Sequence, residues 1–553
     1  AAAREYAVAA RSGLRLVPYV TRVALEARDD HTFRPGLHDQ AWFEKQRASM
    51  VPCTRQAIPY APPAYTLGDE NYLSRGKAEG GGAPETVAAF RAWLQTKYKT
   101  IVALNQTWAS DHASFAAITE PLWLAEAALQ NRSYAAWFDH REFLDTAFTD
   151  LHEQLAGIIR DEHPGAKVGW DGPLRYHWQA GYDFWKWTRN LELNQVYTSH
   201  PLQGDLVRSF AKPGGLRGEW GNNVADNEEG FRAIAWFNLF RQHNSCWWWT
   251  SWGCDYIPFN PDGSPSTYGE WYFDEARELR AGIGKLLLHA KRDGSGVSIL
   301  YSQADHFAAR LSQELDAKAP QRLWKQNLES SAKLIRQAGL QFRYLDRTQL
   351  TGAGLAGTKL LVLPLAVCLS DQQVAAIRAY VKAGGTVLAD GRVGLLTENG
   401  VIRANRPLSD VFGLDLPGGL DAFAHVEPTR GEGETAYQPL EPGEIFTTNR
   451  FGEGLAIRSN VSFGQLLNWP KPEDHPDPLV LPAGLRAPAS CDPALDEVEQ
   501  ILFLDGGARY LAFFAPQDAK PDWHAGCVTV SQSATFRITG RRKEMVPCRR
   551  ILV

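Results

Sequence analysis

The sequence lacks the signals that mark several large classes of protein. No run approaches the ~18 apolar residues that a membrane span requires. The α/β segment after residue 290 contains neither a G-x-G-x-x-G nor a P-loop spacing. The seven cysteines are odd in number and show no CxxC or Cys/His spacing of a metal site. We therefore expect free thiols, no membrane association, and neither a metal nor an organic cofactor.

The chain also lacks a strong excess of charge of one sign. The net charge is −5, from 58 basic and 63 acidic residues mixed along the sequence. No extended basic field is present to attract nucleic acid or an anionic membrane, so a neutral or small polar partner fits better. A secretory signal is missing at the start, which reads instead as the tail of a helix. We expect that the true N-terminus precedes residue 1, which leaves the compartment open; a cytoplasmic bacterial protein is slightly favoured over a secreted one.

Aromatic residues are plentiful, with 19 Trp and 18 Tyr in 553 residues. Aromatic faces can serve as flat platforms for sugars, although packing in the core is the plainer explanation for most of them. The length predicts about three structural units, because a single core rarely grows so large.

Residues 1–290 alternate β-like runs with helical stretches, a pattern typical of a (β/α)8-type barrel with a parallel sheet. Six strands are predicted, at residues 14–22, 64–70, 167–172, 194–201, 215–221 and 245–253. Because a closed barrel of this type needs eight strands, we expect the first two to lie upstream of residue 1. A long insert, from residue 71 to about 165, is rich in helix formers and should shape the pocket.

The pattern changes twice beyond the barrel. Residues 291–426 read as a doubly wound α/β domain. Residues 427–553 are rich in turns and short alternating runs, which predicts a small antiparallel β domain.

Two glutamates stand at the carboxyl ends of predicted barrel strands, Glu70 in LGDEN and Glu219 in LRGEWG. Active sites of parallel barrels are built at these strand ends. Hydrolysis of a glycosidic bond with retention needs one carboxylic acid and one carboxylate about 5–5.5 Å apart. The two glutamates fit these roles, although by itself a glutamate near a turn is more often a solvated or capping residue.

Other polar and aromatic residues at the same strand ends are candidates to line a sugar subsite. For each of them, packing within the fold is an equally good explanation. These candidates are Asp69, Asn71, Trp170, Asp171, Tyr197, His200, Trp220, Trp249 and Trp252.

The sequence of the insert resembles that of a known enzyme family. Residues 93–115, WLQTKYKTIVALNQTWASDHASF, are similar to a stretch of the family 42 β-galactosidases in clan A of the glycoside hydrolases. The resemblance implies that Glu70, just before the insert, is the acid/base, and that Glu219, at the penultimate strand, is the nucleophile. Residues 245–266 resemble the last barrel strand and the loop after it.

The later domains resemble those of the same family. The α/β domain is similar to its trimerisation domain, which implies a homotrimer, and the small β domain also has a counterpart there. The sequence departs from the family at the residue before the acid/base position. The family has Asn there, whereas this chain has Asp69, followed by Glu70 and Asn71.

These features predict a retaining, exo-acting glycosidase that cleaves β-galactosides or related β-linked sugars of a carbohydrate substrate. Two alternatives stay open. One is an endo-acting glycanase that uses the same two glutamates, and the other is a non-catalytic glycan-binding protein. The sequence names neither the sugar nor its linkage.

Overall fold

The computed structural model describes most of the chain. It describes residues 2–11, 15–76, 78–173, 177–197, 201–220, 228–248, 258–260, 262, 264–315, 323–415, 418–419, 444–467, 485–492, 498–514, 527–530 and 550–552. The chain forms two compact units. The first comprises Ala1–Trp220, His306–Leu315 and Glu398–Ile402, and the second comprises Gly221–Asp305, Asp316–Thr397 and Arg403–Val553.

The first unit is built on a parallel sheet. Its strands pair in the order β3, β4, β5 and β6. They span Tyr65–Asp69, Val168–Asp171, Leu193–Val196 and Leu216–Trp220. Most residues of these strands are buried, as expected for parallel strands covered by helices. The predicted mixed α/β fold with a parallel sheet is confirmed. The described strands do not form a closed barrel, so closure stays a prediction.

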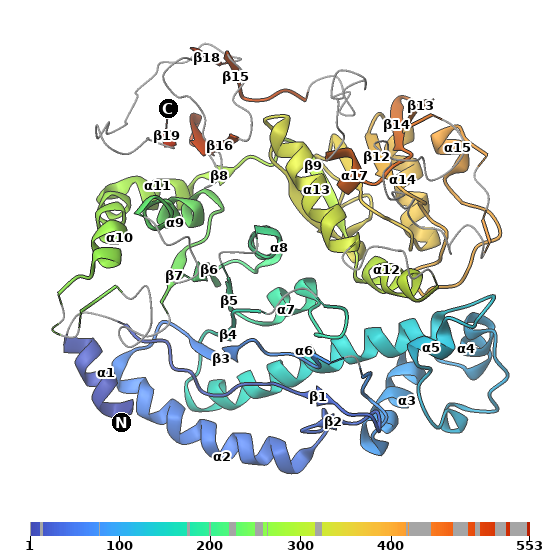
Figure 1. The fold of residues 1–553 in the computed structure, drawn as a ribbon, viewed down its shortest axis with the longest axis horizontal. Helices are drawn as coiled ribbons and strands as arrows, with labels where there is room; N and C mark the ends of the chain where they lie inside the picture. Colours follow the sequence, from blue (N-terminus) through green and yellow to red (C-terminus); the bar gives the residue numbers. More distant parts are fainter. Residues whose placement is uncertain are drawn as a thin grey trace, which may run out of the picture. The chain divides into compact units, whose positions relative to one another are not determined.

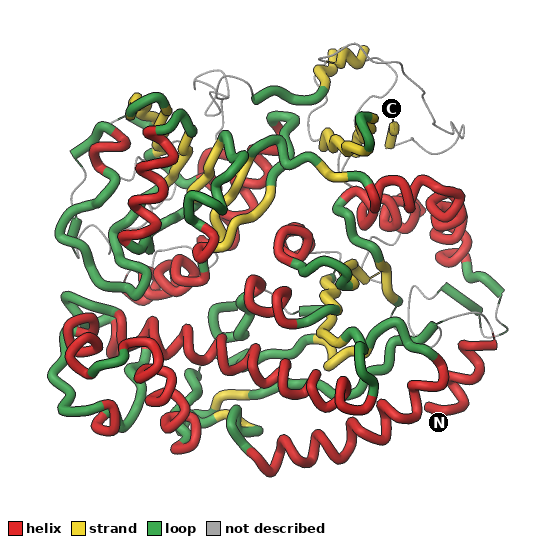
Figure 2. Tube along the Cα trace, turned by 180° about the vertical axis from the view of Figure 1, so that it is seen from behind, coloured by secondary structure: helices red, strands yellow, loops and turns green. Residues whose placement is uncertain are grey.

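Half of the α-helices described before residue 220 come from the predicted insert. The helices of this part of the chain are α1 (Ala2–Arg11), α2 (Gln40–Ala57), α3 (Pro84–Tyr98), α4 (Ile101–Trp108), α5 (Leu124–Ala127), α6 (Ala135–Glu162), α7 (Phe184–Asn190) and α8 (Pro201–Phe210), with two-residue strands β1 (Glu26–Ala27) and β2 (Phe33–Arg34). Among them, α6 and α8 contact the strands of this sheet. With 28 residues α6 is about 42 Å long. It lies alongside α2 in both views (Figures 1 and 2).

The strand predicted at residues 14–22 is corrected by the structure. This segment runs parallel to β3 but forms only isolated bridges, Tyr19 with Thr66 and Ala24 with Tyr72. Pro18 accepts a hydrogen bond from the backbone N–H of Thr66 through its carbonyl group. It cannot donate one in return, because proline has no N–H, and a regular ladder is therefore interrupted. The segment still holds Tyr19 and Arg22 next to the end of β3.

The second unit contains a six-stranded α/β sheet in the order β10-β9-β11-β12-β14-β13. All neighbours are parallel except β13 and β14. The strands are β9 (Val297–Tyr301), β10 (Arg343–Asp346), β11 (Leu360–Leu363), β12 (Thr386–Asp390), β13 (Phe446–Phe451) and β14 (Gly454–Ser459). Its helices are α13 (Leu323–Gln337), α14 (Asp371–Lys382), α15 (Ser409–Phe412) and α17 (Phe463–Leu467). Helix α12 (Gln303–Leu315) follows β9 in the chain, and its residues from His306 on belong to the first unit.

This sheet crosses the boundary that the sequence predicts at residue 426. Residues 446–459 were expected in the small β domain, but β14 pairs in parallel with β12. The hairpin of β13 and β14 therefore extends the α/β sheet, because β12 would otherwise leave an unpaired edge there.

The strands near the end of the chain pair antiparallel with one another and with β8. One sheet has the order β19-β17-β16-β8, and β15 pairs with β18. These strands are β8 (Lys291–Arg292), β15 (Ala489–Asp492), β16 (Glu499–Asp505), β17 (Ala508–Phe514), β18 (Cys527–Val530) and β19 (Arg550–Leu552). Helices α9 (Glu228–Phe240) and α11 (Gly284–His289) share an apolar core with β16 and β17. The unit also includes β7 (Ser245–Trp247) and α10 (Thr267–Glu278).

Two further findings concern expectations from composition. Within the described ranges, no helix combines the length and the apolar character needed to cross a membrane. Cys53, Cys246 and Cys368 are free thiols.

Candidate active site

Asp69 and Glu70 stand at the carboxyl end of β3, where the strand leaves regular geometry. The register between β3 and β4 shifts between Thr66 and Asp69, which is a β-bulge, and Asp69 then lies opposite Asp171. Gly68 has a φ of 105°, and a Cβ there would lie 2.5 Å from the carbonyl oxygen of Thr21. Only glycine fits this approach. Bulges of this kind re-aim side chains next to active sites.

Glu70 itself adopts an unusual backbone conformation. Its φ is 49°, in the left-handed region. Such a conformation costs a non-glycine residue on the order of 1–3 kcal/mol and is concentrated at functional sites. The backbone N–H of Glu70 donates to the carbonyl of Gly172, at a distance of 2.9 Å, which fixes the turn against the end of β4.

One tyrosine from a third strand end joins both acids. The hydroxyl group of Tyr197, which directly follows β5, donates to Asp69 Oδ2 at 3.3 Å and to Glu70 Oε1 at 3.4 Å. Its ring lies on Gly172, where a Cβ would come within 2.5 Å of Tyr197 Cζ. Burial and then the charges of Asp69, Glu70 and Asp171 raise the pKa of Tyr197, so the hydroxyl stays a hydrogen-bond donor.

Two arginines contact Glu70. Arg22 Nη2 lies 2.9 Å and Arg75 Nη2 lies 2.7 Å from Glu70 Oε2. The guanidinium group of Arg75 also stacks over the ring of Tyr72, 4.3 Å from its centroid. The Glu70 side chain keeps 30% of its surface accessible, so a substrate can reach it.

Tyr19 completes the hydrogen bonding of Asp69. Its hydroxyl donates to Asp69 Oδ1 at 2.8 Å. Burial, followed by the hydrogen bond to Asp69, raises the pKa of Tyr19. Two hydroxyl donors on one carboxyl group are the arrangement expected of an ionised acceptor.

Asp171 lies behind this group of residues, 9% exposed, at the end of β4. Burial raises its pKa to about 7, and the charge of Asp69 adds to the increase, while a hydrogen bond from Thr66 opposes it. A carboxyl group with such a pKa carries a proton through the mildly acidic range.

The second predicted glutamate, Glu219, stands opposite Val196 near the end of β6 and is fully buried. The next residue, Trp220, has its ring centroid 6.0 Å from that of Tyr197. Tyr197 thus contacts residues from the ends of both β3 and β6. These two strands are three positions apart in the sheet, or about 14 Å if it were flat. A short distance between the two carboxyl groups therefore requires a strongly curved sheet and stays a prediction.

The structure places two of the predicted sugar contacts inside the fold, which corrects their assignment. Asn71 is 2% exposed and uses its side chain to accept from the Val23 N–H and to donate to Leu67 O and to His152 Nε2. Trp170 is 1% exposed and packs against Phe184 and Trp187. Both side chains are committed to packing, because neither has free surface toward a ligand.

The remaining predicted contacts are in part outside the described residues. His200, Trp249 and Trp252 all fall there. In contrast, Asp69, Asp171, Tyr197 and Trp220 lie near one another at the strand ends, and their contact with a sugar stays a prediction.

Three residues of this cluster were not predicted from the sequence. Tyr19 and Arg22 end a predicted strand, and the rule that barrel sites form at the carboxyl ends of strands would have found them. Arg75 follows Glu70 by five residues in a short turn, and no pattern signals its role. No group of His, Cys, Asp and Glu side chains that could hold a metal ion occurs in the part of the chain that the structure describes.

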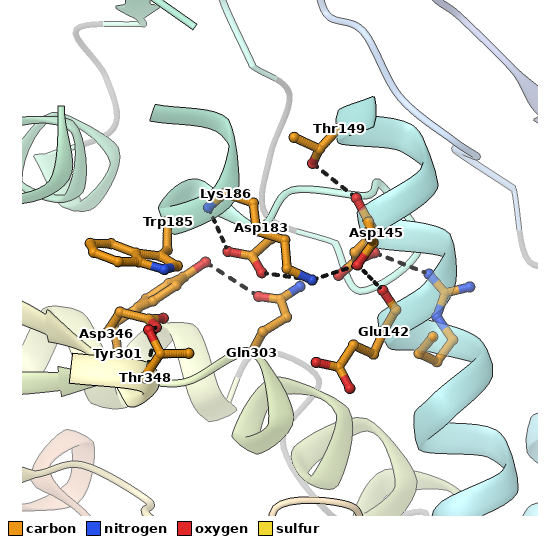
Figure 3. A network of polar contacts seen from close by, with 12 residues as sticks. Glu142, Asp145, Thr149, Asp183, Trp185, Lys186, Tyr301, Gln303, Asp346 and Thr348 are labelled. Atoms are coloured by element: carbon orange, nitrogen blue, oxygen red, sulfur yellow. Dashed lines mark hydrogen bonds and ion pairs between the residues drawn. The ribbon is translucent and has the colours of Figure 1, made fainter. Parts of the chain in front are cut away.

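Polar contacts fix the segment between β4 and β5 against α6. Lys186 of α7 lies 3.6 Å from Asp183 and donates to the hydroxyl of Thr146 at 2.6 Å. On α6, the Thr149 hydroxyl donates to the backbone carbonyl of Asp145 at 2.9 Å (Figure 3). These contacts restrain the connection that follows Asp171, and so help to hold the strand ends in place.

Comparisons with known proteins agree with this geometry. The family model described as "Beta-galactosidase", for glycoside hydrolase family 42, matches residues 80–212. A search of curated proteins found no match. The resemblance to clan A and family 42 that the sequence suggests is confirmed, and it indicates a glycoside hydrolase.

Solved structures share the fold at low sequence identity. A catalytic mutant of a family 42 β-galactosidase from G. stearothermophilus is 14% identical, with a TM-score of 0.66, covering 92% of this chain and 84% of that one. The β-galactosidase from Bacillus circulans sp. alkalophilus is 15% identical, with a TM-score of 0.63 and coverage of 86% and 77%. A family 42 exo-carrageenase from Bacteroides ovatus is 13% identical, with a TM-score of 0.57 and coverage of 93% and 68%.

Proposed function

We propose that the chain is a retaining glycoside hydrolase that removes terminal β-galactosides or related β-linked sugars by double displacement. The observation that carries the proposal is the cluster at the end of β3. There a bulge aims Asp69 and Glu70 at one tyrosine hydroxyl, and that tyrosine also contacts the end of β6. Strand ends of a parallel sheet are where such enzymes carry out their chemistry.

In this proposal Glu70 is the acid/base and Glu219 is the nucleophile. Glu219 attacks the anomeric carbon while Glu70 protonates the departing oxygen, and Glu70 then takes a proton from the water that releases the sugar. Glu219 is 0% exposed, so the proposal requires its carboxyl group to become accessible when the sugar binds. Glu70 is the more accessible of the two, as the group that exchanges protons with solvent must be.

The proposal sets two conditions on the structure. To act as an acid, Glu70 must bind a proton, so the substrate has to loosen its ion pairs with Arg22 and Arg75. Glu219 must face the same space as Glu70. In a regular strand, neighbouring side chains point to opposite faces. Since Trp220 packs on Tyr197, Glu219 can face the same side only if the end of β6 departs from this alternation.

The wider architecture is part of the proposal. We place the catalytic domain within residues 1–290 and expect its strands to belong to a closed barrel. The α/β domain would assemble the protein into a homotrimer, as in the family that it resembles. Sedimentation velocity of the purified chain would test the trimer.

Activity on aryl β-glycosides tests the proposed reaction. We expect hydrolysis by the natural chain and a loss of at least about 1,000-fold in Glu70→Gln and Glu219→Gln, since each removes a group that acts in the transition state. Azide should rescue an alanine variant of either residue, giving a β-glycosyl azide for Glu70→Ala and an α-glycosyl azide for Glu219→Ala. Glu44→Gln, on the exposed face of α2, is the matched control and should keep full activity. Equal activity of all variants would overturn the proposal.

Asp69 favours a second candidate, a longer polysaccharide as the substrate. An ionised Asp only accepts hydrogen bonds, whereas an Asn at that position would also donate. Recognition of the sugar therefore differs from the family pattern. The similarity in fold to the exo-carrageenase makes a polysaccharide substrate worth testing. The sizes of products from an oligosaccharide digest separate the candidates, because an exo-acting galactosidase releases monosaccharide alone.

A further inference from the structure

Asp171 and Asp69 occupy paired positions at the ends of neighbouring strands. The register places them directly opposite each other. Paired residues of adjacent strands have their Cα atoms about 4.8 Å apart and point to the same face. The two carboxyl groups thus lie on one face of the sheet, and Glu70 follows directly after Asp69.

Among the described residues, Asp171 is the acid of this group that the fold encloses. It is more than nine-tenths buried, and within the described part of the chain its Oδ1 atom has no hydrogen-bond partner and no contact with solvent. The Thr66 hydroxyl bonds to the same carboxyl group, and Thr66 in turn accepts from the N–H of Gly68. A buried ionised oxygen without a partner is costly, whereas a protonated carboxyl group can donate to a neighbouring acceptor.

The partners of the other two acids give the same answer. Tyr19 and Tyr197 donate to Asp69, and Arg22 and Arg75 pair with Glu70, whereas Asp171 Oδ1 has no hydrogen-bond partner among the described residues. The proton therefore belongs on Asp171.

We propose that Asp171 is a positioning residue that carries a proton in the active enzyme. The pair then presents a single negative charge beside Glu70. Loss of this proton leaves a buried negative charge on Asp171 opposite the partly exposed Asp69, and their repulsion moves Asp69 and Tyr197, which bonds to both Asp69 and Glu70. Asp171 touches no reacting atom and acts through these two residues. The consequence for catalysis rests on the proposed glycosidase function, but the protonation state does not.

Infrared difference spectroscopy tests the protonation without any substrate. The carbonyl-stretch band of protonated carboxylic acids at pH 6 should be weaker in Asp171→Asn than in the natural protein by the contribution of one group, because Asp305 and Asp390 also contribute to this band. The contribution of Asp171, obtained as the difference between the two proteins, should disappear on titration through about pH 7, the pKa to which burial raises this carboxyl group. Asp69→Asn removes the neighbouring charge, so the band of Asp171 should then titrate at a lower pH. A spectrum of Asp171→Asn identical to that of the natural protein would overturn the proposal.

The pH dependence of activity supplies the second readout. We expect kcat/KM of the natural enzyme to fall about tenfold per pH unit above the pKa of Asp171, and this limb to be absent in Asp171→Asn, which cannot ionise. Asp305→Asn is the matched control, because Asp305 is also buried with its pKa raised to about 7 but lies in the α/β sheet unit. Asp305→Asn should lose the infrared contribution of Asp305 and keep the fall of kcat/KM at high pH. An unchanged limb in Asp171→Asn would contradict the role in positioning. If no substrate is hydrolysed at all, the proposed function fails, while the infrared band still decides the protonation.

Discussion

At the scale of single residues, Tyr197 is the side chain on which the site most depends. It is the described residue that contacts Asp69, Glu70 and Trp220, and so touches groups from two other strand ends. Its ring fits only because Gly172 has no side chain, and its hydroxyl is kept protonated by the surrounding acids. Removing that hydroxyl leaves two carboxyl groups without a shared donor.

We therefore predict that Tyr197→Phe lowers kcat/KM by roughly 10–100-fold, the loss expected for a hydrogen bond to a charged group. Stability should change little, because the ring stays in place. Tyr380→Phe, which removes a hydroxyl that donates to the backbone carbonyl of Thr386 in the second unit, is the control. Steady-state kinetics and a thermal melt check both expectations. Equal activity of the two variants would show that Tyr197 merely packs.

At the scale of elements, the site depends on the bulge that ends β3. Gly68 makes the bulge possible, since its backbone is left-handed and Thr21 approaches closely. Gly214 offers a comparison, because it also has a positive φ, of 78°, but no atom lies within 4 Å of where its Cβ would be. The two glycines separate the cost of backbone strain from the cost of a clash.

Gly68→Ala should destabilise the protein by about 3 kcal/mol or more and abolish activity, since strain and overlap add. Gly214→Ala should lower the free energy of unfolding by only about 1 kcal/mol, from backbone strain alone, and should keep its activity. Chemical denaturation of both variants gives the comparison. Similar losses in the two variants would mean that the close contact at Gly68 relaxes at no cost.

The elements also show what the sequence could and could not predict. Strands β3 to β6 and the helical insert were predicted, because buried parallel strands and long helices leave clear patterns. The segment before β3 failed as a strand because Pro18 interrupts its hydrogen bonding. The hairpin of β13 and β14 was recognised as β structure but given to the wrong domain, since the pattern of a strand does not identify its partner.

The site was predictable to a similar extent. Glu70, Asp69, Asp171 and Tyr197 follow from reading the carboxyl ends of strands, and the same rule applied to the segment before β3 would have added Tyr19 and Arg22. The burial of Asn71 and Trp170 was not predictable, because alternation at the irregular end of a strand cannot be read from one sequence. The ion pair of Arg75 with Glu70 depends on the conformation of a turn.

At the scale of the whole molecule, buried histidines in the first unit and buried aspartates in the second have pKa values shifted in opposite directions. In the first unit, burial lowers the pKa of His152 to about 4 and of His306 to about 3. In the second unit, burial raises the pKa of Asp305 and Asp390 to about 7. A buried neutral histidine loses stability as pH falls from about 6.5, because only the unfolded chain gains the proton. A buried aspartic acid with a raised pKa gains stability over the range from about pH 7 down to about 4, because the folded chain binds the proton more tightly.

Acidification from pH 7 to 5 should therefore raise the melting temperature of the second unit. In the first unit, the raised pKa values of Asp139, Asp150 and Asp171 oppose the lowered pKa values of His152 and His306, so its melting temperature should fall relative to that of the second. The free energy of unfolding of each part of the molecule should change on the order of a few kcal/mol, because a pKa shift of one corresponds to about 1.4 kcal/mol. Differential scanning calorimetry of the full chain would measure the transitions. Limited proteolysis during heating, followed by identification of the peptides that resist cleavage, would assign each transition to one of the two units. A parallel shift of both transitions in the same direction would contradict this division.

The central claim is that two glutamates from the ends of β3 and β6 act on one sugar, and covalent trapping tests it most directly. A glycoside with fluorine at position 2 and an activated leaving group forms a long-lived glycosyl-enzyme, because fluorine slows the step that releases the sugar more than the leaving group slows its attachment. After digestion, mass spectrometry should find one equivalent of sugar on the peptide that contains Glu219, and none in Glu219→Gln. A label on Asp171 or on any other carboxyl group, with Glu219 unmodified, would contradict the account.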